Sequence, residues 1–240
     1  RAGGLGETVG TMTKAAITGW GAQGGLLGAL LASKGFLSTE TILEGRRGFF
    51  NLIGGQANAT KAAENLGQTW ELRNNRIKAY ACGSVAQASV ELMLTLREDR
   101  PVRPEDVTSI WAGLAPICIQ IGNTPNPTNS FEAIVSLQHC LAVALLSGEA
   151  FPYQFSEGRL HDPILMAMRD KVSLSADPSL NWHDASVEVH LRDGSILKRS
   201  TAERDPGSPP AGSITTDEQM ERKFRHLAEH TLPPAQIEQL

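Results

Sequence analysis

A lone lysine, Lys78, lies in a short apolar segment that runs through a glycine into an amphipathic helical pattern. We expect an extended segment over residues 76–82 and a helix that is capped by Ser84. The ammonium group of Lys78 would then lie beside free backbone N–H groups and the positive end of the helix dipole, an arrangement that suits anion binding. The alternative from the local pattern is a surface lysine before an ordinary capped helix.

Histidines are the second group of residues with chemical potential. His139 falls within an apolar helical pattern over residues 130–147 that ends at Gly148, where a core histidine and a site residue are the two alternatives. His226 and His230 lie four residues apart on one face of a predicted C-terminal helix, which makes them a possible metal pair. No recognised third ligand accompanies them, so we expect surface histidines.

The N-terminal part of the chain must position these groups. Residues 1–12 are glycine-rich and predict a loop, and residues 15–33 carry small residues at helical spacing, which predicts a buried helix. That helix contains the dinucleotide-binding spacing Gly19, Gly21, Gly24. No strand precedes these glycines and they fall inside a helical pattern, so the core helix is the favoured interpretation.

The remaining elements follow ordinary local patterns. They are a helix with a connection over residues 51–75, a strand pair or one interrupted strand over residues 107–121 with a bend at Pro116, a helix capped by Asp162, strands over residues 171–175, 185–191 and 195–201 with a turn at Asp193 and Gly194, and a final helix capped by Thr216.

Bulk composition excludes several classes of protein. The chain has 240 residues, of which 41% are hydrophobic, so it can bury a core. A net charge of −4 gives no reason to expect nucleic acid. Three separated cysteines do not suggest a disulfide framework, so we expect a cytoplasmic protein. We expect no membrane segment, because the longest apolar run, around residues 24–32, is too short.

Several of these segments resemble the MmgE/PrpD family, which contains 2-methylcitrate dehydratase, cis-aconitate decarboxylase and iminodisuccinate epimerase. The sequence K-A-Y-A-C-G at residues 78–83 is similar to the family's K-P-Y-A-C-G, and residues 136–148 are similar to its S-x-x-Y/H helix. Further similarities, in the family's order, lie in residues 13–36, 41–50, 151–170, 187–194, 204–214 and 217–228. Family members are about twice as long as this chain, whose length suits one or two domains. The chain therefore resembles the C-terminal half.

The resemblance implies an α+β fold, built from part of an all-helical domain and an inserted α+β lid domain. Residues 1–75 would be a segment of the helical domain, and residues 76–205 would form the lid. Residues 206–240 would be a linker and C-terminal helices that return to the helical domain. It also implies a homodimer, or a heteromer with a chain that supplies the N-terminal half.

The chemistry implied by the resemblance is proton abstraction next to a carboxylate, with loss of water or CO2 from a citrate-like polycarboxylic acid. Such a lyase needs cations for the carboxylates and a base within hydrogen-bond reach. The implied catalytic residues are Lys14, Lys78 and His139. The implied substrate-binding residues are Thr13, Tyr80, Gln87 and Gln138. The resemblance implies no metal ion and no organic cofactor.

The sequence also departs from the family pattern. Ile17, Gly83 and Gln87 occupy positions where active members often carry histidine. Two alternatives to a lyase follow: an isomerase or epimerase on the same scaffold, and a catalytically inactive binding or structural subunit.

Overall fold

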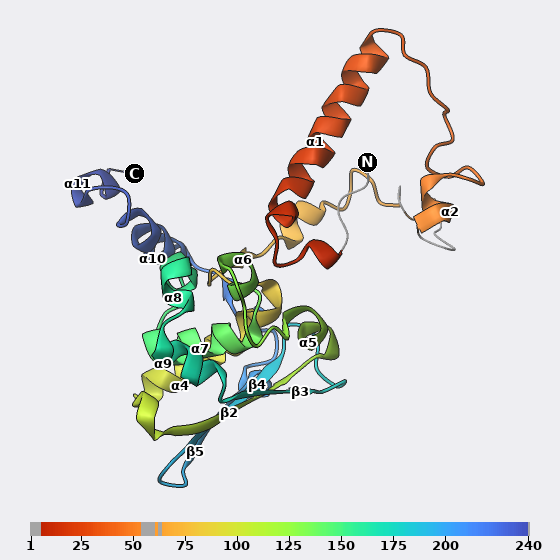
Figure 1. Ribbon diagram of the computed structural model, residues 1–240. Coiled ribbons are helices and arrows are strands. Elements are labelled where there is room, and N and C mark those ends of the chain that lie inside the picture. Colours follow the sequence, from red (N-terminus) through yellow and green to blue (C-terminus); the bar gives the residue numbers. More distant parts are fainter. Residues whose placement is uncertain (1–5, 54–60, 62–63, 240) are drawn as a thin grey trace. The chain divides into compact units, whose positions relative to one another are not determined.

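The computed structural model describes residues 6–53, 61 and 64–239 (Figure 1). Contacts divide the chain into two units, one formed mainly by residues 15–75 and one by residues 5–14 together with 76–240. The predicted loop over residues 1–12 and the predicted helix over residues 51–75 fall partly outside the described residues. Helices combined with a mixed sheet give the α+β fold that was predicted.

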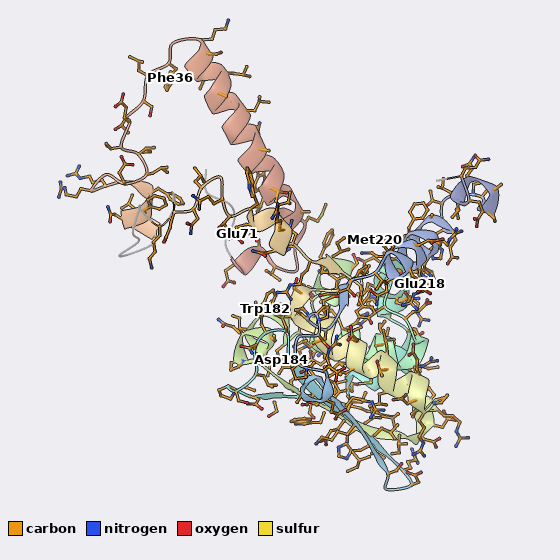
Figure 2. All side chains as sticks on the ribbon, turned by 180° about the vertical axis from the view of Figure 1, so that it is seen from behind. Phe36, Glu71, Trp182, Asp184, Glu218 and Met220 are labelled. Carbon is orange, nitrogen blue, oxygen red and sulfur yellow. The ribbon has the colours of Figure 1, made fainter. Side chains whose placement is uncertain are left out.

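The first unit holds most of α1 (Met12–Ser33), with α2 (Phe49–Ile53) and η2 (Glu71–Asn74). The predicted helix is confirmed, but the prediction that it is buried is wrong for this chain. No residue of α1 is buried, Leu26 is 64% exposed, and the side chains project from the ribbon in Figure 2. A stripe of small residues becomes buried only where a second helix lies against it, and no described residue covers this one.

Helix α1 also passes a composition test for membrane spans. Within the described residues it is the one helix long and apolar enough to cross a bilayer, by length and composition alone. The expectation that no apolar run reaches this length is therefore wrong, because the helix begins at Met12. Core helices and signal sequences pass the same test, so it assigns no membrane role.

The second unit contains a four-stranded sheet in the order β3-β2-β4-β5. Strand β2 (Val107–Leu114) pairs parallel with β3 (Val172–Ala176) and antiparallel with β4 (Ala185–Leu191), which pairs antiparallel with β5 (Ile196–Ser200). Every second residue of β4 is buried, as expected for a strand with one face on the core. The three strands predicted over residues 171–201 and the turn at Gly194 are confirmed.

The prediction of strand over the whole of residues 107–121 is wrong in its second half. Strand β2 ends at Leu114, and helix α5 (Pro116–Gly122) follows. Pro116 occupies the first turn of α5, where its missing N–H costs nothing and its fixed φ suits a helix. The bend expected at this proline is therefore a helix start.

Helices α4 (Gln87–Asp99) and α7 (Leu137–Ser147) pack on the sheet and on each other, and α9 (Pro163–Arg169) packs on α7 (Figure 1). Helix α7 is apolar on all sides and is almost entirely buried, as expected for a central core helix. Asp162 caps α9 as predicted, by accepting a hydrogen bond from the backbone N–H of Ile164.

The single helix predicted over residues 130–147 is two helices, α6 (Ser130–Ala133) and α7. Ser136 breaks the pattern because its hydroxyl oxygen accepts a hydrogen bond of 3.1 Å from the backbone N–H of His139 and so caps α7. Gly148 ends α7 with a φ of +74°, as predicted.

The predicted strand over residues 76–82 is shorter than expected. Only β1 (Ile77–Lys78) forms, paired antiparallel with β6 (Ser213–Ile214). Ser84 does not cap a helix, since it begins a 3-10 turn, η3 (Ser84–Ala86), before α4. The other elements are η1 (Gly6–Thr8), η4 (Pro104–Asp106), η5 (Pro152–Phe155), α8 (Glu157–Leu160), η6 (Thr201–Glu203), α10 (Asp217–Ala228) with the predicted cap at Thr216, and α11 (Pro234–Ile237).

Candidate functional site

The loop after β1 is held in shape by one buried amide, Gln87, at the start of α4. Its Oε1 accepts a hydrogen bond of 3.2 Å from the backbone N–H of Tyr80. Its Nε2 donates to the carbonyl oxygens of Tyr80 at 3.0 Å and Cys82 at 3.1 Å. Gln87 therefore satisfies polar backbone groups of a segment that forms no strand.

Lys78 joins the same loop from the other end. Its Nζ donates a hydrogen bond of 3.0 Å to the Cys82 carbonyl oxygen, so Lys78 and Gln87 meet on one acceptor. Its own carbonyl oxygen accepts a hydrogen bond of 2.7 Å from Lys223 Nζ on α10. Lys78 is exposed, and no carboxylate in the described part of the chain forms an ion pair with it. Its positive charge is thus available to an external anion.

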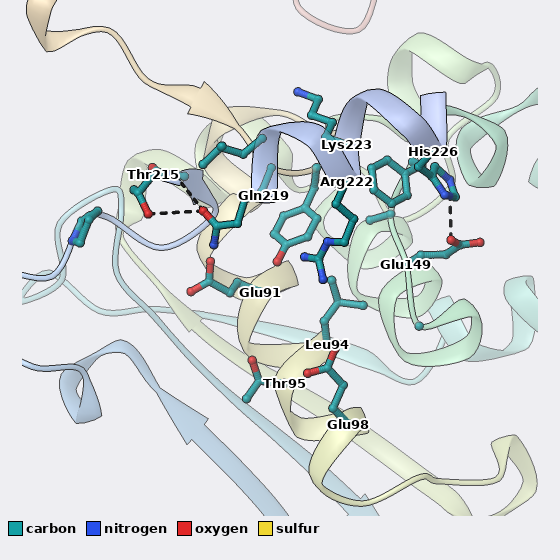
Figure 3. Close-up of a pocket in the computed structure, with 18 of the residues that line it drawn as sticks. Glu91, Leu94, Thr95, Glu98, Glu149, Thr215, Gln219, Arg222, Lys223 and His226 are labelled. Carbon is teal, nitrogen blue, oxygen red and sulfur yellow. Dashed lines mark hydrogen bonds and ion pairs between the residues drawn. The ribbon is translucent and has the colours of Figure 1, made fainter. Parts of the chain in front are cut away.

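A cavity of about 520 Å³ lies beside this loop, between α4, α10 and the loop after α7 (Figure 3). Tyr80 lines it, and burial together with nearby Glu91 raises the pKa of the Tyr80 phenol above its ordinary value. The phenol is therefore a neutral hydrogen-bond donor at any physiological pH. The charged lining residues are Glu91, Glu98, Glu149, Arg204, Arg222 and Lys223.

The charges of the cavity are only partly paired. Glu91 forms an ion pair with Arg204 and also accepts a hydrogen bond from the backbone N–H of Gly212. Arg222 extends from α10 towards Leu94 and Glu98 in Figure 3, and it has no hydrogen bond or ion pair with any described residue. The cavity can therefore offer one unpaired guanidinium and one phenol to a small polar ligand.

The approach of Gly212 to α4 gives a stability prediction. Gly212 has a φ of +73°, and a Cβ at this position would lie 2.5 Å from Gln87 Cβ. We expect Gly212→Ala to lower the free energy of unfolding by about 2 kcal/mol, because it combines backbone strain with a clash against a fixed helix.

Gly207→Ala is the matched control for that substitution. Gly207 has a φ of +88°, but no atom lies within 4 Å of the position that a Cβ would take there. Gly207→Ala should lower the free energy of unfolding only by the strain of a left-handed alanine, about 1 kcal/mol. Urea unfolding of both variants measures the difference, and equal losses would contradict a close contact at Gly212.

His139 lies in the core and not on a surface. It is fully buried on α7, with its Nδ1 3.4 Å from Arg169 Nη1 and its ring centroid 5.8 Å from that of Phe155. Burial, with the charge of Arg169 as the second cause, lowers the pKa of His139 to about 4. Its imidazole is therefore neutral at pH 7, which allows it to act as a base or a hydrogen-bond donor but not as a strong acid.

The other predicted residues lie in different surroundings. Gln138 is buried, and its Nε2 donates a hydrogen bond of 2.7 Å to Asn123 Oδ1. Thr13 and Lys14 are exposed in the first turn of α1, and the described residues provide no hydrogen-bond partner for either side chain.

Comparison with known proteins agrees with this architecture. A sequence model described as the MmgE/PrpD C-terminal domain matches residues 80–240. The chain belongs to the MmgE/PrpD family. The chain is 23% identical, over 95% of its length, to the cis-aconitate decarboxylase-like protein oryM of Aspergillus oryzae. It is 25% identical, over 96% of its length, to cis-aconitate decarboxylase of Aspergillus terreus. It spans about half the length of these relatives, since the matches cover 51% of each.

Three of the seven residues predicted as site residues of an MmgE/PrpD protein come together around the loop between β1 and η3. Lys78, Tyr80 and Gln87 are linked through the Tyr80 and Cys82 carbonyls, as described above. Gln138 and His139 are neighbours on α7. A common site for Lys14, Lys78 and His139 stays a prediction.

Tyr80 lines the cavity and was predicted as a site residue, but sequence reasoning missed the charged lining residues, above all Arg222. A signal for it was present. Gln219, Arg222 and His226 recur at spacings of three and four on a helix whose start the sequence already predicts. Such spacing places polar side chains on one face, and all three line the cavity.

Proposed function

We propose that this chain supplies the C-terminal half, including the lid domain, of a cofactor-independent MmgE/PrpD lyase. Its reaction would begin with proton abstraction next to a carboxylate of a citrate-like polycarboxylic acid. Loss of water, or loss of CO2 with protonation of the resulting carbanion, would follow. The relatives that match the chain are named as cis-aconitate decarboxylases, which favours loss of CO2 from an unsaturated tricarboxylic acid. The observation that carries the proposal is the family match over residues 80–240.

The geometry of Lys78 supports this role. A polycarboxylate substrate needs a cation that is not neutralised by a protein carboxylate, and Lys78 is exposed and unpaired within the described residues. Its ammonium is anchored 3.0 Å from a carbonyl oxygen, so it is oriented before the substrate arrives. A preoriented cation stabilises the enolate-like charge that develops as the proton leaves.

The reaction also needs groups beyond this chain. The neutral imidazole of His139 is buried, and the family histidines are replaced at Ile17, Gly83 and Gln87. We therefore propose that residues preceding Arg1 in the natural protein, or a partner chain equivalent to the N-terminal half, complete the site. Assembly through the exposed face of α1, as a homodimer or a heteromer, belongs to the same proposal.

The test compares two proteins, the polypeptide from the complete natural reading frame and the 240-residue chain alone. Each is incubated with cis-aconitate, citrate and 2-methylcitrate, and proton NMR follows the acids and their products. We expect the complete protein to convert one of the three acids. We expect the chain alone to be inactive. Release of CO2 distinguishes decarboxylation from dehydration.

Three outcomes would contradict this proposal. Turnover by the 240-residue chain alone would show that no further residues are needed. Failure of the complete protein to deplete any of the three acids would favour the binding or structural subunit, an alternative that the replaced histidines already support. Conversion of one stereoisomer into another without loss of water or CO2 would favour an epimerase.

A further inference from the structure

The C-terminal end of α10 brings three metal-binding side chains together. His226, Glu229 and His230 each offer one ligand atom, and these atoms all lie within 4.8 Å of one another. The sequence pattern marked the two histidines as a pair without a third ligand. The structure supplies the third through Glu229, which lies three residues after His226 at the end of α10 and contacts both histidines. We propose that these three residues bind a divalent transition-metal ion such as Zn²⁺.

The distances fit a tetrahedral ion. Glu229 Oε1 lies 3.3 Å from His226 Nδ1 and 3.9 Å from His230 Nε2. Ligands at about 2.0–2.1 Å from a tetrahedral Zn²⁺ lie about 3.4 Å from one another. Small side-chain rotations of the exposed Glu229 and His230 therefore suffice to bring all three atoms onto one ion, with a fourth position left for water.

The first ligand is already oriented for this role. The His226 ring stacks on Phe151 with 3.8 Å between centroids, which fixes the direction of Nδ1. Its other nitrogen, Nε2, is buried without a hydrogen bond, and Glu149 Oε2 lies 3.7 Å away (Figure 3). When Nδ1 binds a metal ion, Nε2 carries the proton and can donate it to this carboxylate. A carboxylate behind a ligating histidine is the usual arrangement at zinc sites.

The surrounding charges also favour a cation. The site lies at the carboxyl end of α10, where the helix dipole is negative. Arg225, next to His226 in the chain, is held by ion pairs to Glu221 and Glu238, so its charge is largely compensated. Arg222, one turn earlier on α10, has no ion pair with a described residue but is exposed, so solvent and salt screen its charge. Lys78 takes no part in this site, and the inference does not depend on the proposed lyase activity.

Zinc titration of the full 240-residue chain tests the site directly. Metal-free, reduced protein is titrated with Zn²⁺ by calorimetry, as wild type and as the Glu229→Gln and His230→Gln variants. We expect one Zn²⁺ per wild-type chain and an affinity at least about tenfold weaker in each variant. Both residues are exposed, so circular dichroism should show unchanged helix content.

His190→Gln is the matched control for this titration. His190 Nε2 lies 3.3 Å from Glu188 Oε2. The substitution therefore removes a histidine that pairs with one carboxylate but has no third ligand beside it. The control should bind Zn²⁺ as the wild type does. Equal binding by wild type, both site variants and control would overturn the proposal, as would no binding by the wild type.

Co²⁺ identifies the ligand atoms independently. A site built of imidazole and carboxylate gives visible absorption bands without a thiolate charge-transfer band. The chain has three free cysteines, Cys82, Cys118 and Cys140, all buried. A thiolate band would place the metal on these cysteines and overturn the assignment to α10.

Discussion

Lys78→Ala is expected to lower kcat/KM of the complete protein by about 10² to 10³, the loss that follows removal of one preoriented charge-stabilising donor. Lys78 is the last residue of β1, and its exposed ammonium has no carboxylate partner among the described residues. Under the proposed function it binds a substrate carboxylate and faces the charge that develops during proton abstraction. The measurement is steady-state kinetics on the acid that the complete protein converts.

A purely structural role for Lys78 predicts a different result. The side chain donates one hydrogen bond, to the Cys82 carbonyl, and loss of one such bond costs about 1 kcal/mol of stability. If Lys78 acts on the substrate, as proposed, thermal unfolding should therefore change little while turnover collapses; a purely structural role would lower turnover only as far as stability falls. Lys198→Ala is the control, because Lys198 pairs with Glu188 on the sheet and is expected to leave kinetics unchanged. Equal activity of Lys78→Ala and Lys198→Ala would remove Lys78 from the site.

The second large effect concerns pH and His139. Burial, followed by the charge of Arg169, lowers the pKa of His139 from 6.5 to about 4 in the folded chain. As pH falls below 6.5 the unfolded chain takes up the proton first, so this residue favours unfolding increasingly down to pH 4. The full shift corresponds to about 3 kcal/mol of stability that is present above pH 6.5 and lost by pH 4.

Urea unfolding at several pH values between 4 and 7 measures this dependence. The amide of the His139→Gln variant cannot titrate, so its stability should fall less steeply than that of the wild type as pH falls below 6.5. Arg169 on α9, which faces His139, carries a guanidinium that does not titrate between pH 4 and 7 and so contributes no slope. Parallel curves for wild type and His139→Gln would contradict a depressed pKa at His139.

The sequence by itself determined the features that depend on a few neighbouring residues. Helix α7 ends at Gly148, which adopts a positive φ. Helix α10 begins after Thr216, whose side chain caps its first turn. The strands on either side of Gly194 follow from alternation over five to seven residues. The K-A-Y-A-C-G segment with Lys78 is also local, and it suggested the family before any contact was known.

Local patterns failed where a single residue redirected the backbone. Pro116 was expected to bend a strand, but the apolar residues after it form α5, since a helix and a short buried strand share the same composition. Ser136 divided the helix predicted over residues 130–147, because its hydroxyl caps the second half. Both residues are good helix starters, but the apolar pattern around each of them does not show whether a helix begins there.

Tertiary structure alone decided which side chains became available for chemistry. His139 is neutral because the core buries it and because Arg169, 30 residues away, lies against it. The carboxylate of Glu91 accepts a hydrogen bond from the backbone N–H of Gly212, 121 residues away. Arg222 on the facing helix is left without a partner among the described residues. Charge state and pairing depend on which distant residues share a low-dielectric space, and no short stretch of sequence specifies that. The exposed face of α1 has the same physical origin, because burial of a small-residue stripe requires a second surface that the described residues do not place there.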